Sequence, residues 1–338
     1  MRRAPLVVLV AVSCGRSGFD PLHDAAISPQ DANVLGHVQL ASGWTATLLV
    51  DLTGIVPYRA DDFDDGSNEV LDNAPITVAT LYAPFVASLA VSAGRDVIEL
   101  ASDGTPTVHD YRPPAPDMNG PDQCAHMAFG DTPDVGPQLW IGASSQQAGD
   151  GVYRVDPTTW EITREAMNNN VNGLAWDSTG AYDSTGTPAM YFVDQSFLYR
   201  RDGSGSATSL VAEMNTMDSL VVSTTQIFVE NDLTTGDEID SIAPGTHAVA
   251  TFATGSAFHV IEEGPLSATS VIAIDNTASL ASYAGGSATP IASSTDPNWV
   301  WQSASAPQPP HPLAGGYVVL ESNRTLDRDD LVYIAPEQ

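Results

Sequence analysis

Three oxygen-bearing side chains stand at equivalent points of short apolar runs and could together hold a metal ion. Asn172 opens the run NGLAWD, Asp218 follows the first residue of MDSLVV, and Asn298 directly precedes WVWQ. Amide and carboxylate oxygens are the ligands that hard divalent cations such as calcium prefer. The three residues therefore form a candidate metal site, provided that the fold gathers the starts of these runs at one place.

The run that opens with Asn172 also resembles a motif of a known family. NGLAWD is similar to the Asn-Gly-Leu run that opens an inner strand in the gluconolactonase/regucalcin-like six-bladed β-propellers, where the Asn is a metal ligand at the channel mouth. In that family an Asp that opens the next blade is another ligand, and Asp218 matches it. The resemblance covers these two blades well and the others in architecture alone. It implies a divalent cation and a lactonase-type hydrolysis, with Asp218 as the one residue that could act as base.

Other parts of that family's metal site have no counterpart here. The family adds a Glu from a Gly-Glu-Gly-Pro run in another blade, and the sequence contains no such run. Calcium takes roughly six to eight oxygens, so water and main-chain carbonyls would have to complete the shell. As an alternative to a metal site, the Asn-Gly pair can simply start a strand as a turn dipeptide. The positions that correspond to Asn172 in the other blades are Ile76, Ala125, Ala257 and either Pro297 or Asn298.

A second group of acidic residues lies in the segment RADDFDDGSNE. If Asp61 is the first ligand of a calcium loop of the helix-loop-helix type, Phe63 stands where the third-position ligand belongs. A solvated acidic loop is therefore favoured over a calcium site, although both interpretations remain open. The four acidic residues concerned are Asp61, Asp62, Asp64 and Asp65.

The remaining chemically notable residues favour structural roles. Cys124 and His126 would lie on one face of a strand, but two ligands do not make a zinc site, so we expect a buried and inert thiol. Tryptophans could present sugar-stacking surfaces, but most fall at strand positions of a repeat, which favours the core. These tryptophans are Trp140, Trp160, Trp176, Trp299 and Trp301.

The charge balance restricts the partners. The chain has 42 acidic residues against 12 basic ones, the basic ones are all Arg, and the net charge is -30. Such a surface repels phosphates and anionic lipids, so we expect no nucleic acid partner and no membrane contact by the folded domain. Because the sequence has no Lys, it also excludes Schiff-base chemistry and a phosphate-binding GK[ST] loop.

The first residues have the features of an export signal. Arg2 and Arg3 precede an apolar stretch over residues 4–12, and Ala11-Val12-Ser13-Cys14 resembles the lipobox of bacterial lipoproteins, in which the cysteine is acylated. The prediction is a signal peptide over residues 1–13, a flexible tether over 14–34 and a folded domain over 35–338. Gly15 in place of an inner-membrane retention Asp favours the outer membrane. A plain secretory signal is the alternative.

The elements that must position these residues form a repeat of about 40 to 50 residues. Each unit has an apolar first run and two further apolar runs, the first five units add a more polar fourth run, and turn dipeptides such as Asp-Gly and Asp-Pro separate the runs. Four strands at this period predict an all-β fold, a six-bladed β-propeller with four-stranded blades. Seven blades or an irregular two-domain β protein are the alternatives. The first runs contain Val78, Met127, Leu174, Leu220, Phe258 and Trp299.

The sixth unit predicts how the ring closes. It contains three strand-like runs, while WTATLLVDL, which starts at Trp44, is a strand-like run without a unit of its own. Pairing of this run with LVYIA, which starts at Leu331, would close the ring by joining an N-terminal strand to the C-terminal blade. Between the first two runs of that unit lies the Pro-rich segment 305–316, which cannot form a central strand.

The sequence therefore predicts an exported propeller of the cell envelope, lipid-anchored through Cys14. We expect it to be a binding or scaffolding module for a protein or small ligand, because a propeller offers two faces and needs no catalytic set for such a role. A metal-dependent hydrolase of lactonase type and a carbohydrate-binding propeller are the two alternatives. Three or more converging ligands would favour the first alternative, and exposed tryptophans at recurring positions would favour the second.

Overall fold

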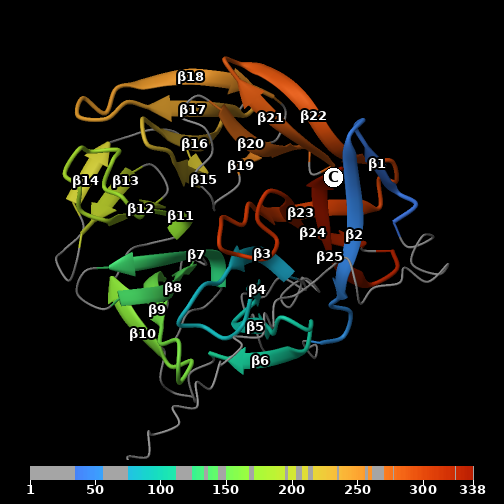
Figure 1. Ribbon diagram of the computed structural model, residues 1–338. Coiled ribbons are helices and arrows are strands. Elements are labelled where there is room, and N and C mark those ends of the chain that lie inside the picture. The colour runs from blue at the N-terminus through green and yellow to red at the C-terminus, as the bar shows by residue number, and fades with distance from the viewer. Residues whose placement is uncertain are drawn as a thin grey trace, which may run out of the picture.

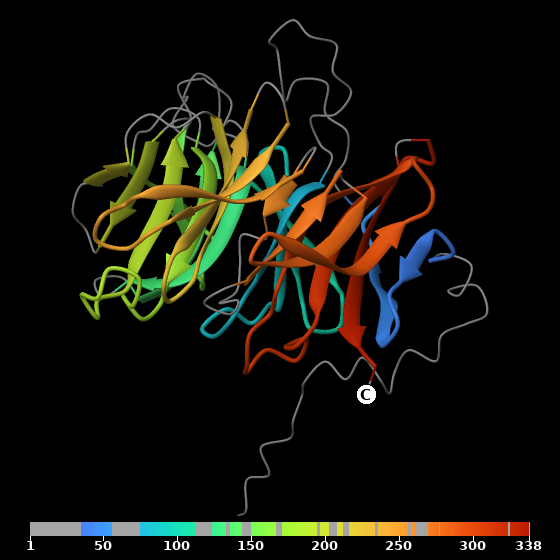
Figure 2. The same ribbon diagram turned by 90° about the horizontal axis from the view of Figure 1, so that it is seen from above.

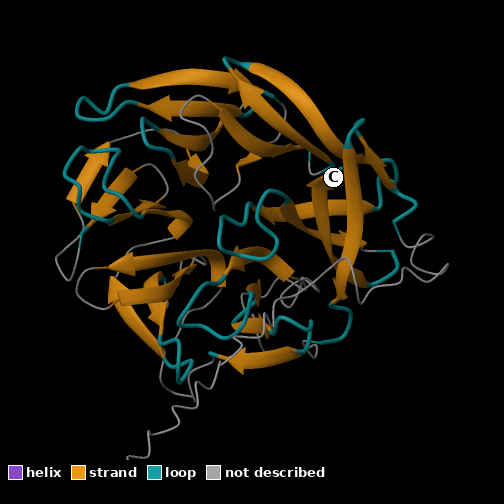
Figure 3. Cartoon of the chain, viewed as in Figure 1, coloured by secondary structure: helices purple, strands orange, loops and turns teal. Residues whose placement is uncertain are grey.

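The protein is a ring of six β-sheets around a central axis (Figure 1). The computed structural model describes 25 strands and, within the part of the chain that it covers, no helix (Figure 3). The described residues are 35–55, 75–111, 124–132, 136–143, 150–166, 171–194, 197–202, 208–211, 216–233, 236–255, 258–260, 270–276, 278–323 and 325–337. The all-β, six-bladed prediction is therefore confirmed.

Each sheet is one blade, and its strands follow one another from the axis outward. Blade one comprises β3 (Pro75–Thr80), β4 (Leu89–Ala93), β5 (Asp96–Leu100) and β6 (Pro106–Asp110). Blade two comprises β7 (Cys124–Thr132), β8 (Gly136–Ala143), β9 (Gly151–Val155) and β10 (Ile162–Ala166). Blade three comprises β11 (Val171–Asp177), β12 (Ala189–Asp194), β13 (Phe197–Arg201) and β14 (Thr208–Val211).

The second half of the chain supplies the other three blades. Blade four comprises β15 (Thr216–Val222), β16 (Ile227–Asp232), β17 (Glu238–Ile242) and β18 (Val249–Thr254). Blade five comprises β19 (Phe258–Val260), β20 (Ser270–Asp275), β21 (Ser279–Ala284) and β22 (Ser287–Ser294), with β1 (Val38–Leu40) added at its outer side. Blade six comprises β23 (Trp299–Ser305), β24 (Tyr317–Asn323), β25 (Arg328–Pro336) and β2 (Trp44–Asp51).

Burial decreases from the axis outward, as the polarity of the runs predicts. In blade one every residue of β4 is buried, whereas β6 is exposed or half-buried. The apolar clusters lie between neighbouring blades, and one of them joins Tyr191 of blade three to Leu220 of blade four. A single blade cannot cover both of its faces, so the ring is stable because each blade covers its neighbours. No helix in the described part of the chain is apolar and long enough to cross a membrane.

The ring closes through the N-terminal strand β2, as predicted. It pairs antiparallel with β25, with Trp44 opposite Pro336 and Leu48 opposite Val332. Figure 2 shows the blue β2 beside the red strands of blade six. The sequence did not predict β1, which pairs with β22 and adds a fifth strand to blade five. Its three residues are too few for an alternating pattern, and the structure forms it because β2 has already brought the segment to this place.

A buried polar contact fixes the segment just before β1. Nε2 of His37 lies 2.9 and 3.0 Å from the two carboxylate oxygens of Glu321, a residue with 0% exposure. The indole Nε1 of Trp301 donates to the same carboxylate at 3.0 Å, and the His37 ring stacks on Trp299 at 4.1 Å. The main-chain carbonyl of His37 accepts from the Thr295 N–H at 2.7 Å. The N-terminal segment is therefore attached at the junction of blades five and six.

Replacement of His37 tests this contact. His37→Ala leaves a buried carboxylate without its imidazole partner, and we expect the free energy of unfolding to fall by about 3 kcal/mol. Denaturant unfolding of the wild type and the variant measures the loss.

The matched control is Glu321→Gln, alone and combined with His37→Ala. If the contact is energetically significant, the double variant loses less stability than the two single variants added together. Strict additivity of the two losses would show that His37 and Glu321 do not interact energetically.

Candidate functional site

The innermost strands of the blades run in the same direction, so the axis has two chemically different ends. The Thr77 and Thr80 hydroxyls in β3 lie 3.2 and 2.6 Å from those of Ser303 and Ser305 in β23, which is a parallel arrangement. We call the end where inner strands begin the strand-start mouth and the opposite end the strand-end mouth. The predicted metal ligands belong to the strand-start mouth, because they lie at or just before the first residues of inner strands.

A β-bulge marks the strand-start mouth in four consecutive blades. The pairing register shifts at Ile76 in β3, at Ala125 in β7 and at Asn172 in β11. In β15 it shifts across Asp218 and Ser219. The repeat aligns these same positions, so the bulges confirm the alignment. A bulge redirects a side chain and increases local twist, and bulges are frequent beside functional sites.

The structure brings Asn172 and Asp218 to neighbouring positions on adjacent inner strands. A Cβ added to Gly173 would lie 2.9 Å from the Cα of Ser219, so β11 and β15 approach closely at this point. The Asn-Gly pair lies near the start of strand β11, and the glycine is needed for the close approach of the next backbone. Asn172 is 7% exposed. The Asp218 side chain lies outside the described residues, so the metal prediction stays a prediction.

Asn298 lies in blade six, and its described contacts are all within that blade. Its amide nitrogen donates to Oδ1 of Asp296 at 2.8 Å, and its carbonyl oxygen accepts from the Thr325 hydroxyl at 3.2 Å. These two hydrogen bonds give the exposed Asn298 side chain a local structural role.

Sequence reasoning missed two ionisable residues near the bulge of blade four. Glu230 is 2% exposed, and its Oε2 accepts from the Ser219 hydroxyl at 3.1 Å. Nδ1 of His259 in β19 lies 3.6 Å from the same oxygen. The signal in the sequence was an acid within the apolar run QIFVEN. Over the residues that the structure describes, no group of three or more His, Cys, Asp or Glu side chains could hold a metal ion.

Other predicted residues have clear positions or lie beyond the described ranges. Cys14 and the acidic loop with Asp61, Asp62, Asp64 and Asp65 lie outside them. Cys124 is fully buried, and burial raises the pKa of its thiol, in line with the predicted inert thiol. Three of the tryptophans are at most 5% exposed and cannot present a sugar-stacking face, namely Trp140, Trp299 and Trp301.

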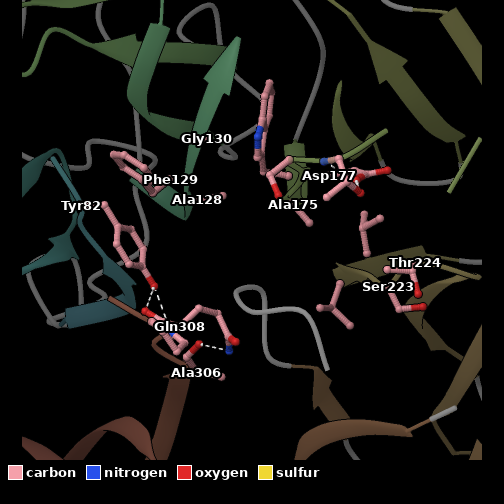
Figure 4. A pocket seen from close by; sticks show the side chains of 16 residues that line it. Tyr82, Ala128, Phe129, Gly130, Ala175, Asp177, Ser223, Thr224, Ala306 and Gln308 are labelled. Atoms are coloured by element: carbon pink, nitrogen blue, oxygen red, sulfur yellow. Dashed lines mark hydrogen bonds between the residues drawn. The ribbon is translucent and has the colours of Figure 1, made fainter. Parts of the chain in front are cut away.

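A cavity of about 400 Å³ opens at the strand-end mouth (Figure 4). Its walls come from the ends of the inner strands of four blades and from the Pro-rich loop 305–316. No local signal in the sequence predicts this cavity, because its residues belong to five separate segments. They are Tyr82, 128–130, 175–179, 221–224 and, in the Pro-rich loop, Ala306, Gln308 and Pro309.

Three aromatic rings line this cavity. The Tyr82 and Phe129 rings have their centroids 5.3 Å apart and are tilted by 51°. The half-buried Trp176 lies against Gly130, where an added Cβ would meet the indole at 2.3 Å. A residue larger than glycine at position 130 would therefore displace the Trp176 ring. The position of the Trp176 ring in the wall therefore requires glycine at position 130.

Hydrogen bonds to blade one fix the Pro-rich loop that forms one wall. The Tyr82 hydroxyl donates to the Gln308 carbonyl at 3.0 Å and accepts from the Gln308 N–H at 2.6 Å. Nε2 of His311 lies 3.0 Å from the Ser88 carbonyl, and its Nδ1 accepts from the Leu313 N–H at 3.1 Å. This arrangement requires a neutral imidazole with its proton on Nε2. Burial lowers the pKa of His311, which favours the same neutral form.

The comparisons with known proteins support the architecture. No protein-family model matches the sequence, and the search of curated proteins finds no significant relative. Among solved structures, an auxiliary nutrient binding protein from Bacteroides ovatus is 9% identical, with a TM-score of 0.54 over 89% of this chain and 78% of that one. A gluconolactonase from Xanthomonas campestris is 15% identical, with a TM-score of 0.54 over 79% of this chain and 88% of that one.

These likenesses define the class of protein. The chain is a six-bladed β-propeller, and its structural neighbours include propellers of the gluconolactonase type. At such low identities the likeness shows the fold alone, so the function has to be argued from the site itself.

Acid should loosen the wall formed by the Pro-rich loop. Because the folded state holds His311 at a pKa below its ordinary value of 6.5, the unfolded chain binds the proton more readily. We therefore expect the contribution of His311 to stability to be complete well above pH 6.5 and to decline as the pH falls below that value. Denaturant unfolding across the acidic range measures the slope.

The matched control for this effect is His311→Gln, which keeps an N–H donor and an acceptor but does not titrate. Its stability should depend less on pH than that of the wild type. An unchanged slope in the variant would assign the pH dependence to other groups.

Proposed function

We propose that this propeller is a binding module that takes a small, partly apolar ligand in the strand-end cavity. The observation that carries the proposal is the cavity itself, about 400 Å³ in volume and walled by Tyr82, Phe129 and Trp176. Small-molecule sites typically have volumes of about 300–1,000 Å³ and apolar linings with few polar groups. The cavity also lies at the axis, where the inner strands of several blades hold its walls in place.

The expected export signal suggests a location for this binding module. Acylation of Cys14 would tether the domain to the cell envelope, with residues 14–34 as the spacer and the outer membrane as the favoured site. A tethered propeller that captures a small molecule is compatible with the nutrient binding protein among its structural neighbours. The acidic surface, with a net charge of -30, also favours contact with water over contact with anionic lipid.

Binding of a neutral apolar dye tests the proposed cavity. N-phenyl-1-naphthylamine fluoresces in apolar surroundings, and we expect saturable binding with one dye for each chain. Trp176→Ala removes one aromatic wall and should weaken the binding at least about tenfold. Fluorescence titration measures both affinities, and thermal unfolding confirms that the variant is folded.

The control variant is Phe197→Ala, in which the lost ring is partly exposed in β13 and is no part of the cavity wall. It should bind the dye like the wild type. Equal affinity in the wild type and in Trp176→Ala would mean that the dye binds elsewhere and would remove the basis of the proposal.

A second candidate function uses the strand-start mouth. Asn172 and Asp218 fall at bulges of neighbouring inner strands, which supports a divalent cation there and with it a hydrolase of lactonase type. Asn172 and Asp218 would hold the ion, and the ion would polarise a carbonyl or activate water. Glu230 and His259 lie near the bulge of blade four, but they form no group of three acidic, His or Cys side chains with another described residue, so this function ranks below ligand binding.

Thermal unfolding in calcium and in chelator tests the second candidate. An ion that binds only the folded state at about 100 times its dissociation constant adds roughly 2.7 kcal/mol. We expect this gain in the wild type and its loss in the Asn172→Ala/Asp218→Ala variant. A gain that survives in that variant would point to the acidic loop. The matched control is a variant in which the four acidic residues of that loop are changed to Asn, namely Asp61, Asp62, Asp64 and Asp65. No gain with any divalent ion would exclude the metal site.

A further inference from the structure

The described wall of the strand-end cavity carries no positive charge. None of the 16 residues that line it is Arg or His, and its one ionisable acid is Asp177. The chain as a whole carries a net charge of -30. An anionic ligand would therefore enter an unfavourable potential and meet no cation among these residues.

Three hydroxyl groups of the wall use their hydrogen-bond donors within the protein. The Thr179 hydroxyl donates to Asp177 at 2.8 Å and accepts from the Ala181 N–H at 3.1 Å. The Ser223 hydroxyl donates to the Gln226 carbonyl at 2.8 Å and accepts from the Gln226 N–H at 3.1 Å. The Tyr82 hydroxyl is engaged in both directions by the Gln308 backbone.

The Asp177 carboxylate is held by its own loop as well. Its Oδ1 accepts from the Thr179 N–H at 2.9 Å and its Oδ2 from the Tyr182 N–H at 3.0 Å. These bonds keep the carboxylate in place while its negative charge remains beside the cavity. The charge of the carboxylate attracts a cation whether or not that cation has an N–H, and a ligand with an N–H could also donate it to a carboxylate oxygen, which can accept more than one hydrogen bond.

The acceptors and aromatic faces that remain suit a cation. Nε2 of Gln308 donates one of its two hydrogens to the Ala306 carbonyl at 2.9 Å, and the amide oxygen is an acceptor. The indole N–H of Trp176 is buried and has no hydrogen-bond partner among the residues that the structure describes, so it is one donor that the cavity wall does not use within the protein. The faces of aromatic rings are electron-rich and attract ammonium groups that approach within about 6 Å.

We propose that the ligand of the strand-end cavity is an organic cation, a tertiary or quaternary ammonium with apolar substituents. This inference rests on the proposed binding function and specifies its ligand class. The apolar substituents fill the cavity between Phe129, Trp176 and the valines at the end of β15. The ammonium lies against the aromatic faces, where the charge of Asp177 in the cavity wall attracts it.

Three aromatic probes of different charge test the ligand class. Benzyltrimethylammonium, benzyl alcohol and benzenesulfonate each compete with N-phenyl-1-naphthylamine for the full chain. We expect the cation to displace the dye at a concentration at least about fivefold lower than the neutral probe, as one or two cation–π contacts predict. The sulfonate should be the weakest competitor. Equal or stronger displacement by the neutral or anionic probe overturns the inference while the dye itself still reports the cavity.

Two further experiments distinguish binding in the cavity from general attraction of the cation to the acidic chain: replacement of one aromatic ring and addition of salt. Phe129→Leu keeps the wall apolar but removes its π face, so it should weaken the binding of the cation more than the binding of benzyl alcohol. In about 0.5 M NaCl the Debye length falls to about 4 Å, and the preference for the cation should persist. If the preference for the cation disappears in salt and is insensitive to Phe129→Leu, it comes from the surface charge. That result would overturn the proposed cation site in the strand-end cavity.

The two proposals fail in different ways. If the dye does not bind, calorimetric titration with benzyltrimethylammonium alone decides whether the cavity takes a ligand at all. Dye binding without a preference for the cation removes the ligand class and leaves the binding function. Cation binding that Phe129→Leu and Trp176→Leu both weaken supports the two proposals together.

Discussion

The ring exists because β2 supplies the fourth strand of blade six. Without it β25 would present an unpaired edge, and neighbouring blades could separate at the junction where the first and last parts of the chain meet. The His37–Glu321 contact adds a buried polar attachment of the N-terminal segment at the junction of blades five and six. The hydroxyl pairs of Thr77 with Ser303 and Thr80 with Ser305 then align the inner strands of blades one and six.

Closure also decides where chemistry can occur. Because the inner strands all run the same way, the axis has a strand-start mouth with bulges and polar groups and a strand-end mouth with aromatic walls. The resemblance to gluconolactonase-like propellers concerns the first mouth, and the cavity lies at the second. The two proposals of function therefore concern different ends of one molecule and can be tested separately.

The strand-end cavity depends directly on the closing junction. The Pro-rich loop belongs to blade six, but the Tyr82 hydroxyl and the Ser88 carbonyl that hold it belong to blade one. Any opening between these blades would separate Gln308 from Tyr82 and break the wall. The proposed ligand binding would therefore depend on ring closure, and a bound ligand that contacts both sides would stabilise the ring.

The sequence by itself determined the repeat, the order of strands in each blade, the closing strand and the exclusion of the Pro-rich segment from the sheets. These follow from local periodicity and turn residues, which the chain carries wherever it folds. Only the tertiary structure decided the pairing of β1, the His37–Glu321 contact, the position of Glu230 and the cavity. His37 and Glu321 are 284 residues apart in the sequence, and Tyr82 and Gln308 are 226 apart. No local pattern encodes such contacts, because the closure of the ring alone brings these residues together.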